Sequence, residues 1–427
     1  MSRLKSFGAF KGGIIGDMQK SQKIFLGTLA IILLALLTLI FYEGSKVYRS
    51  WSQKPLGAVL DYPTLASSVD VSSNETVVSA LQTIFPEGTL VPSATVNVES
   101  TKTPFSTESP DTKRVMPTQT LRASVCGNLP PMMLLGIGSD ARSDAYRYGR
   151  ADVIRAVRID FQAETVTILG FPRDLWVDIP EINDNLGSSY QKLNTAYIYG
   201  NPGLSYWDHP SEGPGLLART LDRNFGLRSN HYLAISMDVF VDAIDALGGL
   251  DFYFPNGVDG RSSYDRSDRL VFPAGENHLN GEQVLTFARM RNVSTFARSN
   301  HQNVVMCTLE EKIKSPEIIP KIPALISAFT DNIQTDLTPE QITQLACLGT
   351  QMPRSNIVFA SFPEGTFSDT YTYDPILGAN TFIWDSDFDV VRSYVDQFEA
   401  GTWPLVDSDV SSSDVNGNDG GVGSRCE

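Results

Sequence analysis

Apolar positions in the middle of the chain change repeatedly between strand-like and helix-like spacing. Met132–Ile137 is a short apolar run that ends in a glycine, which predicts a buried strand. Asp152–Phe161 and Thr165–Phe171 are rich in β-branched residues and are separated by three residues only, so we expect a hairpin. His231–Ile235 and Leu250–Phe254 have the length and composition of two further strands.

Helix-like segments lie between and after these strands. Gly213–Phe225 places its leucines on one face and is followed by Gly226, a typical helix stop. Asp238–Leu247 predicts a second helix. Asn280 with Gln283, and Thr338 with Gln341, have capping-box spacing, and each pair predicts the start of a helix. Strands and helices that alternate in one body indicate an α/β domain.

One apolar segment near the N-terminus is of a different kind. Ile24–Phe41 contains no charged residue and is close to the roughly 20 residues that cross a bilayer. Basic residues dominate the preceding stretch, so the positive-inside rule predicts a cytoplasmic 1–23, a transmembrane helix at 24–42 and an external remainder. A cleavable signal peptide is the competing interpretation.

Composition divides the external part. Residues 43–125 are rich in Ser, Thr and Pro and predict an extended stalk. We expect the catalytic domain at 126–350, and residues 351–404 as an aromatic-rich extension that either caps the domain or contacts glycan. Residues 405–427 have the composition of a disordered acidic tail.

Net charge and cysteine usage narrow the class of protein. The formal charge of −15 argues against nucleic acid as a partner, because nucleic-acid binders carry basic patches. The four cysteines fit an oxidising, extracellular environment, where disulfides persist. Sequence alone leaves three pairings open, and of these Cys307–Cys347 is favoured because both residues lie in helical segments.

Two aspartates are candidates for a metal site. Asp140 follows the first strand and a Gly-Ser pair, and Asp152 begins the next strand. Two carboxylates at neighbouring strand ends suit Mg²⁺, which combines a few carboxylates with water and phosphate oxygens. Each aspartate taken singly is equally consistent with a turn or a strand start.

Several arginines are candidates for binding phosphate. Arg173 follows the second strand of the hairpin, and Lys192 precedes a helical segment. Arg289 and Arg291 are separated by one residue, so in an extended segment both guanidinium groups lie on one face. The guanidinium group of an arginine can donate two parallel hydrogen bonds to two oxygens of a phosphate. Arg298 and Gln302 are spaced by four residues, as on one face of a helix.

Motifs of other enzyme classes are missing from the sequence. It contains no phosphate-binding P-loop, no His-Glu-x-x-His zinc motif and no Gly-x-Ser-x-Gly nucleophile motif. The four histidines stand in dissimilar contexts, and no catalytic triad is apparent.

Several segments together resemble the LytR–CpsA–Psr family of cell-envelope proteins. They are LLGIGSDAR, RADVI, TILGFPRDLWVDIP, KLNTAYIYG, DALGGLDFYFP, PAGENHLNGEQVLTFARMR and FARSNHQNVV, which occur in the family's order between Met133 and Val305. The resemblance implies a mixed central β-sheet sandwiched between helices, with an apolar tunnel for a lipid. It also implies Mg²⁺-dependent transfer of a glycopolymer from a polyprenyl-pyrophosphate carrier to peptidoglycan, by an enzyme anchored in the cell membrane.

The resemblance assigns roles to the candidate residues. Asp140 and Asp152 are placed on the metal side of the pyrophosphate. Arg173, Arg289 and Arg291 are placed on its oxygens, and Arg298 and Gln302 complete the head-group site. Lys192 is added as a further cation from its place in the sequence.

Two departures from the family pattern remove charge near this site. Ser294-Thr295 stand where the family usually has an aspartate, and His301 stands where a second arginine is common. They motivate two alternatives, a non-catalytic pyrophosphate-binding or envelope-regulatory protein and a polyprenyl-pyrophosphate phosphatase. The polymer, the general base and the oligomeric state are left open.

Overall fold

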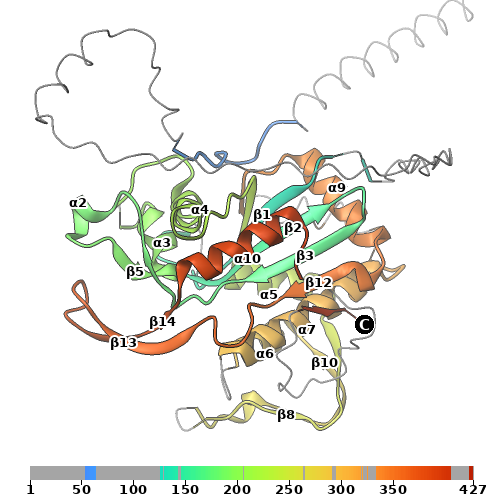
Figure 1. Cartoon of the computed structure of the whole chain (residues 1–427). Coiled ribbons are helices and arrows are strands. Elements are labelled where there is room, and N and C mark those ends of the chain that lie inside the picture. Colours follow the sequence, from blue (N-terminus) through green and yellow to red (C-terminus); the bar gives the residue numbers. More distant parts are fainter. Residues whose placement is uncertain are drawn as a thin grey trace, which may run out of the picture. The chain divides into compact units, whose positions relative to one another are not determined.

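The computed structural model describes residues 53–63, 126–127, 129–142, 146–204, 206–262, 265–290, 295–318, 320, 325, 333–404 and 423–426. The chain divides into two compact units, Tyr62–Arg122 and the remainder (Met1–Asp61 with Ala123–Glu427). The fold described below belongs to the second of these units (Figure 1).

A seven-stranded sheet forms the centre of the fold. Its strands occur in the order β11-β6-β1-β2-β3-β12-β15. They are β1 Met132–Ser139, β2 Ala151–Asp160, β3 Thr165–Gly170, β6 His231–Ser236, β11 Gln334–Thr335, β12 Ile357–Ala360 and β15 Gly423–Arg425. β1 pairs antiparallel with β2 and parallel with β6, so the sheet is mixed, as the family resemblance implies.

Helices cover both faces of this sheet. Side chains alternate between the two faces along a strand. Arg158 of β2 donates to the carbonyl oxygen of Glu399 in α10 (Phe388–Ala400), whereas Arg155 donates to Asn303 in α7 (Thr295–Lys314). The positions of these two arginines, an odd number of residues apart, therefore place α10 and α7 on opposite faces. This arrangement agrees with the expected α/β class (Figure 1).

The remaining described elements surround the sheet. The helices are α2 Asn183–Leu186, α3 Leu193–Gly200, α4 Glu212–Phe225, α5 Met237–Ala246, α6 Gly281–Ala288 and α9 Pro339–Gln351, with 3₁₀ turns at Asp268–Leu270 and Arg354–Asn356. The outer strands are β4 Trp176–Asp178, β5 Tyr190–Lys192, β7 Leu250–Phe254, β8 Val258–Asp259, β9 Val271–Phe272, β10 Gly275–Leu279, β13 Ser368–Asp374 and β14 Ala379–Asp385.

Local sequence signals account for most of these boundaries. Asn280 and Thr338 both form the expected capping boxes, with the Gln283 and Gln341 side chains accepting from the cap backbone. Gly226 ends α4 in the left-handed conformation, which a residue without a Cβ adopts at little cost. The strands expected from apolar runs are present as β1, β2, β3, β6 and β7.

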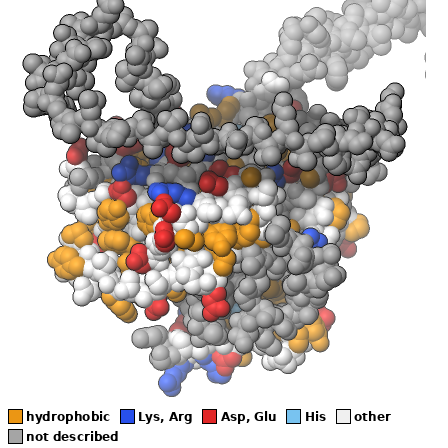
Figure 2. Space-filling view, in the orientation of Figure 1, with side chains coloured by type: hydrophobic (Ala, Val, Ile, Leu, Met, Phe, Trp, Pro, Cys, Tyr) orange, Lys and Arg blue, Asp and Glu red, His pale blue; other side chains and the backbone are white. Residues whose placement is uncertain are grey.

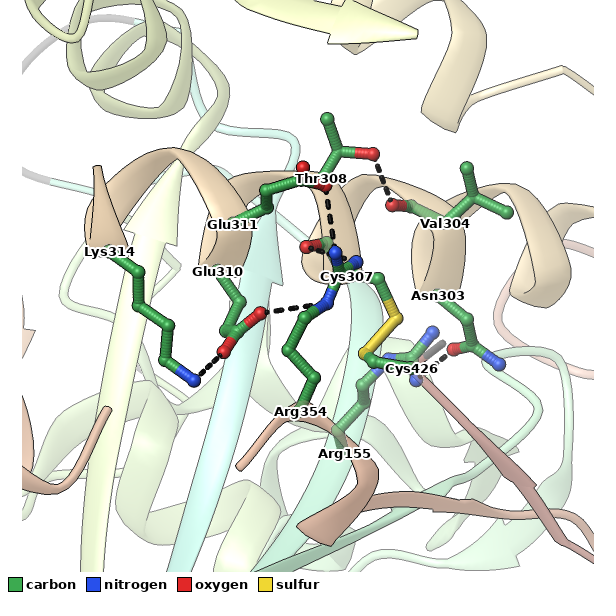
Figure 3. The surroundings of a disulfide bond; sticks show 10 residues. All are labelled: Arg155, Asn303, Val304, Cys307, Thr308, Glu310, Glu311, Lys314, Arg354 and Cys426. Carbon is green, nitrogen blue, oxygen red and sulfur yellow. Dashed lines mark hydrogen bonds and ion pairs between the residues drawn. A yellow bond between two sulfur atoms is a disulfide. The ribbon is translucent and has the colours of Figure 1, made fainter. Parts of the chain in front are cut away.

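The disulfides differ from the favoured pairing. Cys126 is bonded to Cys347, and Cys307 is bonded to Cys426, so the prediction of Cys307–Cys347 is wrong. The two helices, α7 and α9, do pack together, but Cys347 of α9 is bonded to Cys126, in the segment before β1. On α7, Cys307 faces the end of the chain (Figure 3).

The C-terminal part of the chain is more closely integrated than its composition suggests. β12 pairs parallel with β3, which places residues after 350 within the central sheet. β15 pairs antiparallel with β12, and Cys426 is buried. The disordered tail expected at 405–427 is therefore wrong for residues 423–426.

Part of the segment expected to form a stalk contacts the folded domain. The backbone N–H of Leu56 donates to Leu337, and Arg219 donates to the carbonyl oxygen of Asp61. None of the described helices is long and apolar enough to cross a membrane, and the span expected at 24–42 lies outside the described residues.

Candidate functional site

The loop that joins β1 to β2 positions Asp140. The backbone N–H of Asp140 donates to Arg150 at 3.0 Å, and the N–H of Arg150 donates back to Asp140 Oδ1 at 2.6 Å. A Cβ on Gly149 would lie 2.1 Å from Ser139 Oγ and 2.7 Å from Ala141 Cβ, so no larger residue fits without moving this loop. The loop therefore holds one oxygen of Asp140 in a fixed position at the end of β1.

Arg173 is the centre of an ion-pair cluster just after β3. Its guanidinium pairs with Asp152 and, through Nε, with Asp174 Oδ2 at 3.1 Å. Lys192 Nζ lies 3.1 Å from Asp174 Oδ1. The side chains of these four residues are only 14–21% exposed, so solvent screens their charges weakly. Asp152, Arg173 and Lys192 are thus brought together, as expected.

The electrostatics of this cluster favour the charged forms of Arg173 and Asp174. Burial disfavours the guanidinium of Arg173, but the neighbouring Asp152 and Asp174 carboxylates outweigh it and raise the pKa of Arg173. Burial also opposes ionisation of Asp174, yet Arg173 and Lys192 together hold its pKa below the usual value. The charges of the two cations and the two carboxylates cancel. An anion therefore binds here by taking the place of one carboxylate beside a cation.

A second cluster is centred on Arg155, three residues after Asp152 in β2. The guanidinium of Arg155 donates to Asn303 Oδ1 at 2.8 Å, to Gln302 Oε1 at 3.1 Å and to the carbonyl oxygen of Ser299 at 3.4 Å. All three acceptors are neutral groups of α7, and Figure 3 shows Arg155 reaching Asn303 on that helix. Arg155 is 7% exposed and Arg298 is 9% exposed, so two guanidinium groups are buried here.

The buried arginines affect each other. Burial and the charge of Arg298 lower the pKa of Arg155 to about 10. A buried cation whose hydrogen-bond acceptors are all neutral costs free energy, and such costs are concentrated at binding sites. The sequence did not identify Arg155 as a candidate, because in sequence it is an ordinary polar position of a predicted strand. Its strand position opposite α7 distinguishes it only once the fold is known.

The expected clamp is therefore divided between two clusters. The ion-pair cluster comprises Asp152, Arg173, Asp174 and Lys192, and the buried-arginine cluster comprises Arg155, Arg298 and Gln302. β2 connects them, because Asp152 and Arg155 lie three residues apart, about 10 Å along a strand. The register shift opposite Gly138 and Ser139 leaves Asp152 without a partner residue in β1, so the regular alternation of faces is interrupted between Asp152 and Arg155.

Arg289 does not contact these clusters in the described part of the structure. Arg289 is the C-cap of α6 in a helical conformation and is exposed, so the extended Arg-x-Arg arrangement is wrong at this residue. Arg291 lies outside the described residues. His301, in place of a charged residue, is partly buried beside Phe287, with ring centroids 4.7 Å apart, and burial lowers its pKa.

The carboxylates at the ends of β1 and β2 fit a magnesium ion bound partly through phosphate. Within the described part of the chain no three acidic, histidine or cysteine side chains gather into a metal-binding group. Asp140 and Asp152 each use only Oδ1 in the contacts given above, which leaves a second oxygen on each. Two carboxylate oxygens suit Mg²⁺ when water and ligand phosphates complete its coordination.

Comparison with known proteins places this geometry in a family. The model of the LytR_cpsA_psr family matches residues 95–380. The polyisoprenyl-teichoic acid–peptidoglycan teichoic acid transferase TagV of Bacillus subtilis is 29% identical over 48% of this chain and 50% of its own length. Regulatory protein MsrR of Staphylococcus aureus is 27% identical over 49% of this chain and 58% of its own length. The chain thus spans 50% of the length of TagV and 58% of the length of MsrR.

A solved structure supports the fold. The crystal structure of protein gbs0355 from Streptococcus agalactiae superposes with a TM-score of 0.50 at 19% identity, over 64% of this chain and 88% of that chain. The family match covers both clusters, from Asp140 to Gln302, and extends over most of the central sheet. This chain belongs to the LytR_cpsA_psr family.

Proposed function

We propose that this protein transfers a glycopolymer from a polyprenyl-pyrophosphate carrier to peptidoglycan. The observation that carries the proposal is the half-buried Arg173, held between Asp152 and Asp174 within the family-matched region. The name of TagV, a transferase acting between polyisoprenyl-linked teichoic acid and peptidoglycan, supports this substrate class.

The charges of the ion-pair cluster suit a pyrophosphate that binds by exchange. When a phosphate approaches, Arg173 exchanges Asp152 for phosphate oxygens and keeps Asp174 as its second partner. Lys192 remains fixed by Asp174 and adds a second positive charge. A magnesium ion held by Asp140 and Asp152 would neutralise further charge on the phosphates.

The reaction requires one bond to form and one to break. A peptidoglycan hydroxyl oxygen attacks the phosphorus that carries the polymer, and the bridging P–O bond breaks to release polyprenyl phosphate. Both oxygens of Asp174 are engaged in ion pairs, so we assign Asp152 to accept the hydroxyl proton. Arg173 stabilises the charge that develops on the departing phosphate.

The disulfides support an external location for the folded domain. All four cysteines are paired in Cys126–Cys347 and Cys307–Cys426, and such bonds persist in oxidising compartments. We propose that 24–42 anchors the chain in the cell membrane, with 1–23 in the cytoplasm and the catalytic domain outside.

The test uses the full chain in detergent, a lipid-linked oligosaccharide, peptidoglycan, and either Mg²⁺ or a chelator. Arg173→Ala is expected to lower turnover by about 10²–10³, the usual effect of removing one positioned donor. Arg223→Ala, at an ion-paired arginine with a 57% exposed side chain, is the matched control and should leave turnover unchanged. Undiminished transfer by Arg173→Ala would contradict the proposal.

The same assay separates two other functions. A non-catalytic regulatory protein, a role that the name of MsrR and the uncharged His301 favour, binds the carrier without turnover in Mg²⁺. A phosphatase releases inorganic phosphate without an acceptor. Transfer that depends on both Mg²⁺ and peptidoglycan excludes the two.

A further inference from the structure

The hairpin of β13 and β14 carries an aromatic face that the proposed chemistry does not use. Cross-strand partners Tyr371 and Phe382 lie opposite each other, as do Tyr373 and Asn380, and Asp369 and Trp384. Because cross-strand partners share a face, these six residues form one surface, here called the aromatic face. Figure 1 shows the hairpin extending from the body of the domain.

The aromatic rings form a continuous row. The rings of Tyr371 and Phe382 lie 5.9 Å apart between centroids, and those of Phe382 and Trp384 lie 5.7 Å apart, both edge to face. Tyr371 is 71% exposed and Tyr373 is 60% exposed, so neither ring is used to fill the core. Large exposed aromatic surfaces of this kind mark binding sites.

The base of the hairpin is joined to the ion-pair cluster. The backbone N–H of Trp384 donates to the carbonyl oxygen of Asp174 at 2.9 Å, and Trp384 forms a bridge with Leu175. Gln191, next to Lys192, donates to Asp374 Oδ1 at 2.9 Å. The aromatic face therefore begins at a residue that contacts the candidate site directly.

The charge of the hairpin selects among possible occupants. Residues 368–385 contain Asp369, Asp374 and Asp385 and no lysine or arginine. An anionic polymer or an anionic lipid surface would be repelled, because such ligands require cationic side chains. Figure 2 shows hydrophobic and acidic side chains interspersed on the face of the molecule in view.

The composition of the aromatic face matches an uncharged sugar chain. Aromatic rings pack against the C–H faces of sugar rings, while the carboxylate of Asp369 and the amide of Asn380 can bond hydroxyl and N-acetyl groups. No aliphatic side chain lies on this face, unlike a surface built for lipid or for a hydrophobic protein partner.

We infer that the aromatic face binds the acceptor, an uncharged glycan strand of N-acetylated amino sugars, and directs one of its hydroxyl groups toward Arg173. The inference rests on the proposed function for the identity of the acceptor. The donor, with its pyrophosphate, is anionic and belongs at the cationic groups. The hairpin thus separates acceptor recognition from donor recognition.

The binding test uses chitotetraose, a neutral oligomer of N-acetylglucosamine, titrated into the full chain in detergent. The double variant Tyr371→Ala/Tyr373→Ala is expected to bind about tenfold more weakly, because it loses two exposed aromatic contacts. Tyr253→Ala, at a tyrosine of β7 that is 64% exposed, is the matched control and should bind normally. No binding by the parent chain at millimolar sugar, or equal binding by the double variant, would overturn the inference.

Two further measurements distinguish this inference from the proposed function. In the transfer assay the double variant should raise the KM for peptidoglycan and leave kcat unchanged, whereas Arg173→Ala lowers kcat. Weaker sugar binding in a chain with no transfer activity would support the aromatic face while refuting the transferase. Loss of binding to anionic vesicles, with sugar binding intact, would identify the face as a lipid surface and overturn the inference.

Discussion

At the residue scale, the most informative feature is how the arginines are partnered. Arg173 is held between two carboxylates, whereas Arg155 bonds only neutral acceptors among the described residues and lies close to the charge of Arg298. The guanidinium of Arg173 binds an anion by giving up one of its carboxylate partners. The guanidinium of Arg155 is buried beside neutral acceptors, so it attracts an anion without such an exchange. The two clusters therefore suit different parts of one doubly charged ligand.

Replacing Arg155 tests whether its burial serves binding or folding. Arg155→Met removes a buried charge, so we expect an unfolding temperature equal to or above that of the parent, because desolvating a charge costs several kcal/mol. Turnover should fall by about 10²–10³ if the group contacts the pyrophosphate. Thermal denaturation and the transfer assay measure the two effects. A lower unfolding temperature with unchanged turnover would show that Arg155 only joins β2 to α7.

The pH dependence of stability tests the ion-pair cluster. The pKa of Asp174 is lowered in the folded state by Arg173 and Lys192, against the effect of burial, so its contribution is present above the unfolded pKa of about 3.9. It is lost as the pH falls through the folded pKa. Asp174→Asn should therefore cost about 1–3 kcal/mol at pH 7, and this cost should shrink at an acidic pH below the unfolded pKa. Urea denaturation at both pH values measures this, and a cost independent of pH would contradict the assignment.

At the element scale, short loops and caps determine where functional side chains lie. The β1–β2 loop folds so closely over Ser139 and Ala141 that only glycine fits at position 149. This close approach fixes Asp140 at the strand end, next to the start of β2. The β4–β5 pair in the same way places Lys192 against Asp174.

A pair of glycine substitutions tests this role of the loop. Gly149→Ala places a Cβ against Ser139 Oγ and should destabilise the fold by about 1–3 kcal/mol, as overpacking does, and weaken Mg²⁺ binding. Gly349→Ala, in α9 with no atom within 4 Å of the new Cβ, should stabilise by up to about 1 kcal/mol. Denaturation curves and Mg²⁺ titration compare them. Equal behaviour of the two variants would refute the loop's role.

At the scale of the whole molecule, two disulfides fasten the segment before β1 and the segment with β15 to the helices α9 and α7. Cys307–Cys426 joins residues 119 apart and Cys126–Cys347 joins residues 221 apart. β15 also covers the outer edge of β12, which would otherwise present unpaired backbone groups. The C-terminus is thus a structural part of the sheet.

Removing the last five residues should reveal this contribution. Deletion of 423–427 eliminates both β15 and one disulfide, and we expect a loss of about 4–5 kcal/mol from the disulfide alone, given its loop length. Cys426→Ser keeps the strand and serves as the control for the covalent bond. Size-exclusion chromatography should show association of the deletion variant only, through the exposed edge of β12. Monomeric behaviour of both would contradict the edge role.

The local sequence pattern determined the helices and strands of this protein, and the tertiary structure determined which residues contact one another. Apolar runs, capping boxes and Gly226 identified strands and helices correctly because these signals act over a few residues. The order of motifs likewise identified the family, and it predicted correctly that Arg173 and Lys192 lie in one cluster. The disulfide pairing, the return of β15 to the sheet and the burial of Arg155 depend on contacts between residues distant in sequence. Such contacts leave no pattern within a short stretch of sequence, so they are determined only when the chain folds and the sheet brings distant residues together.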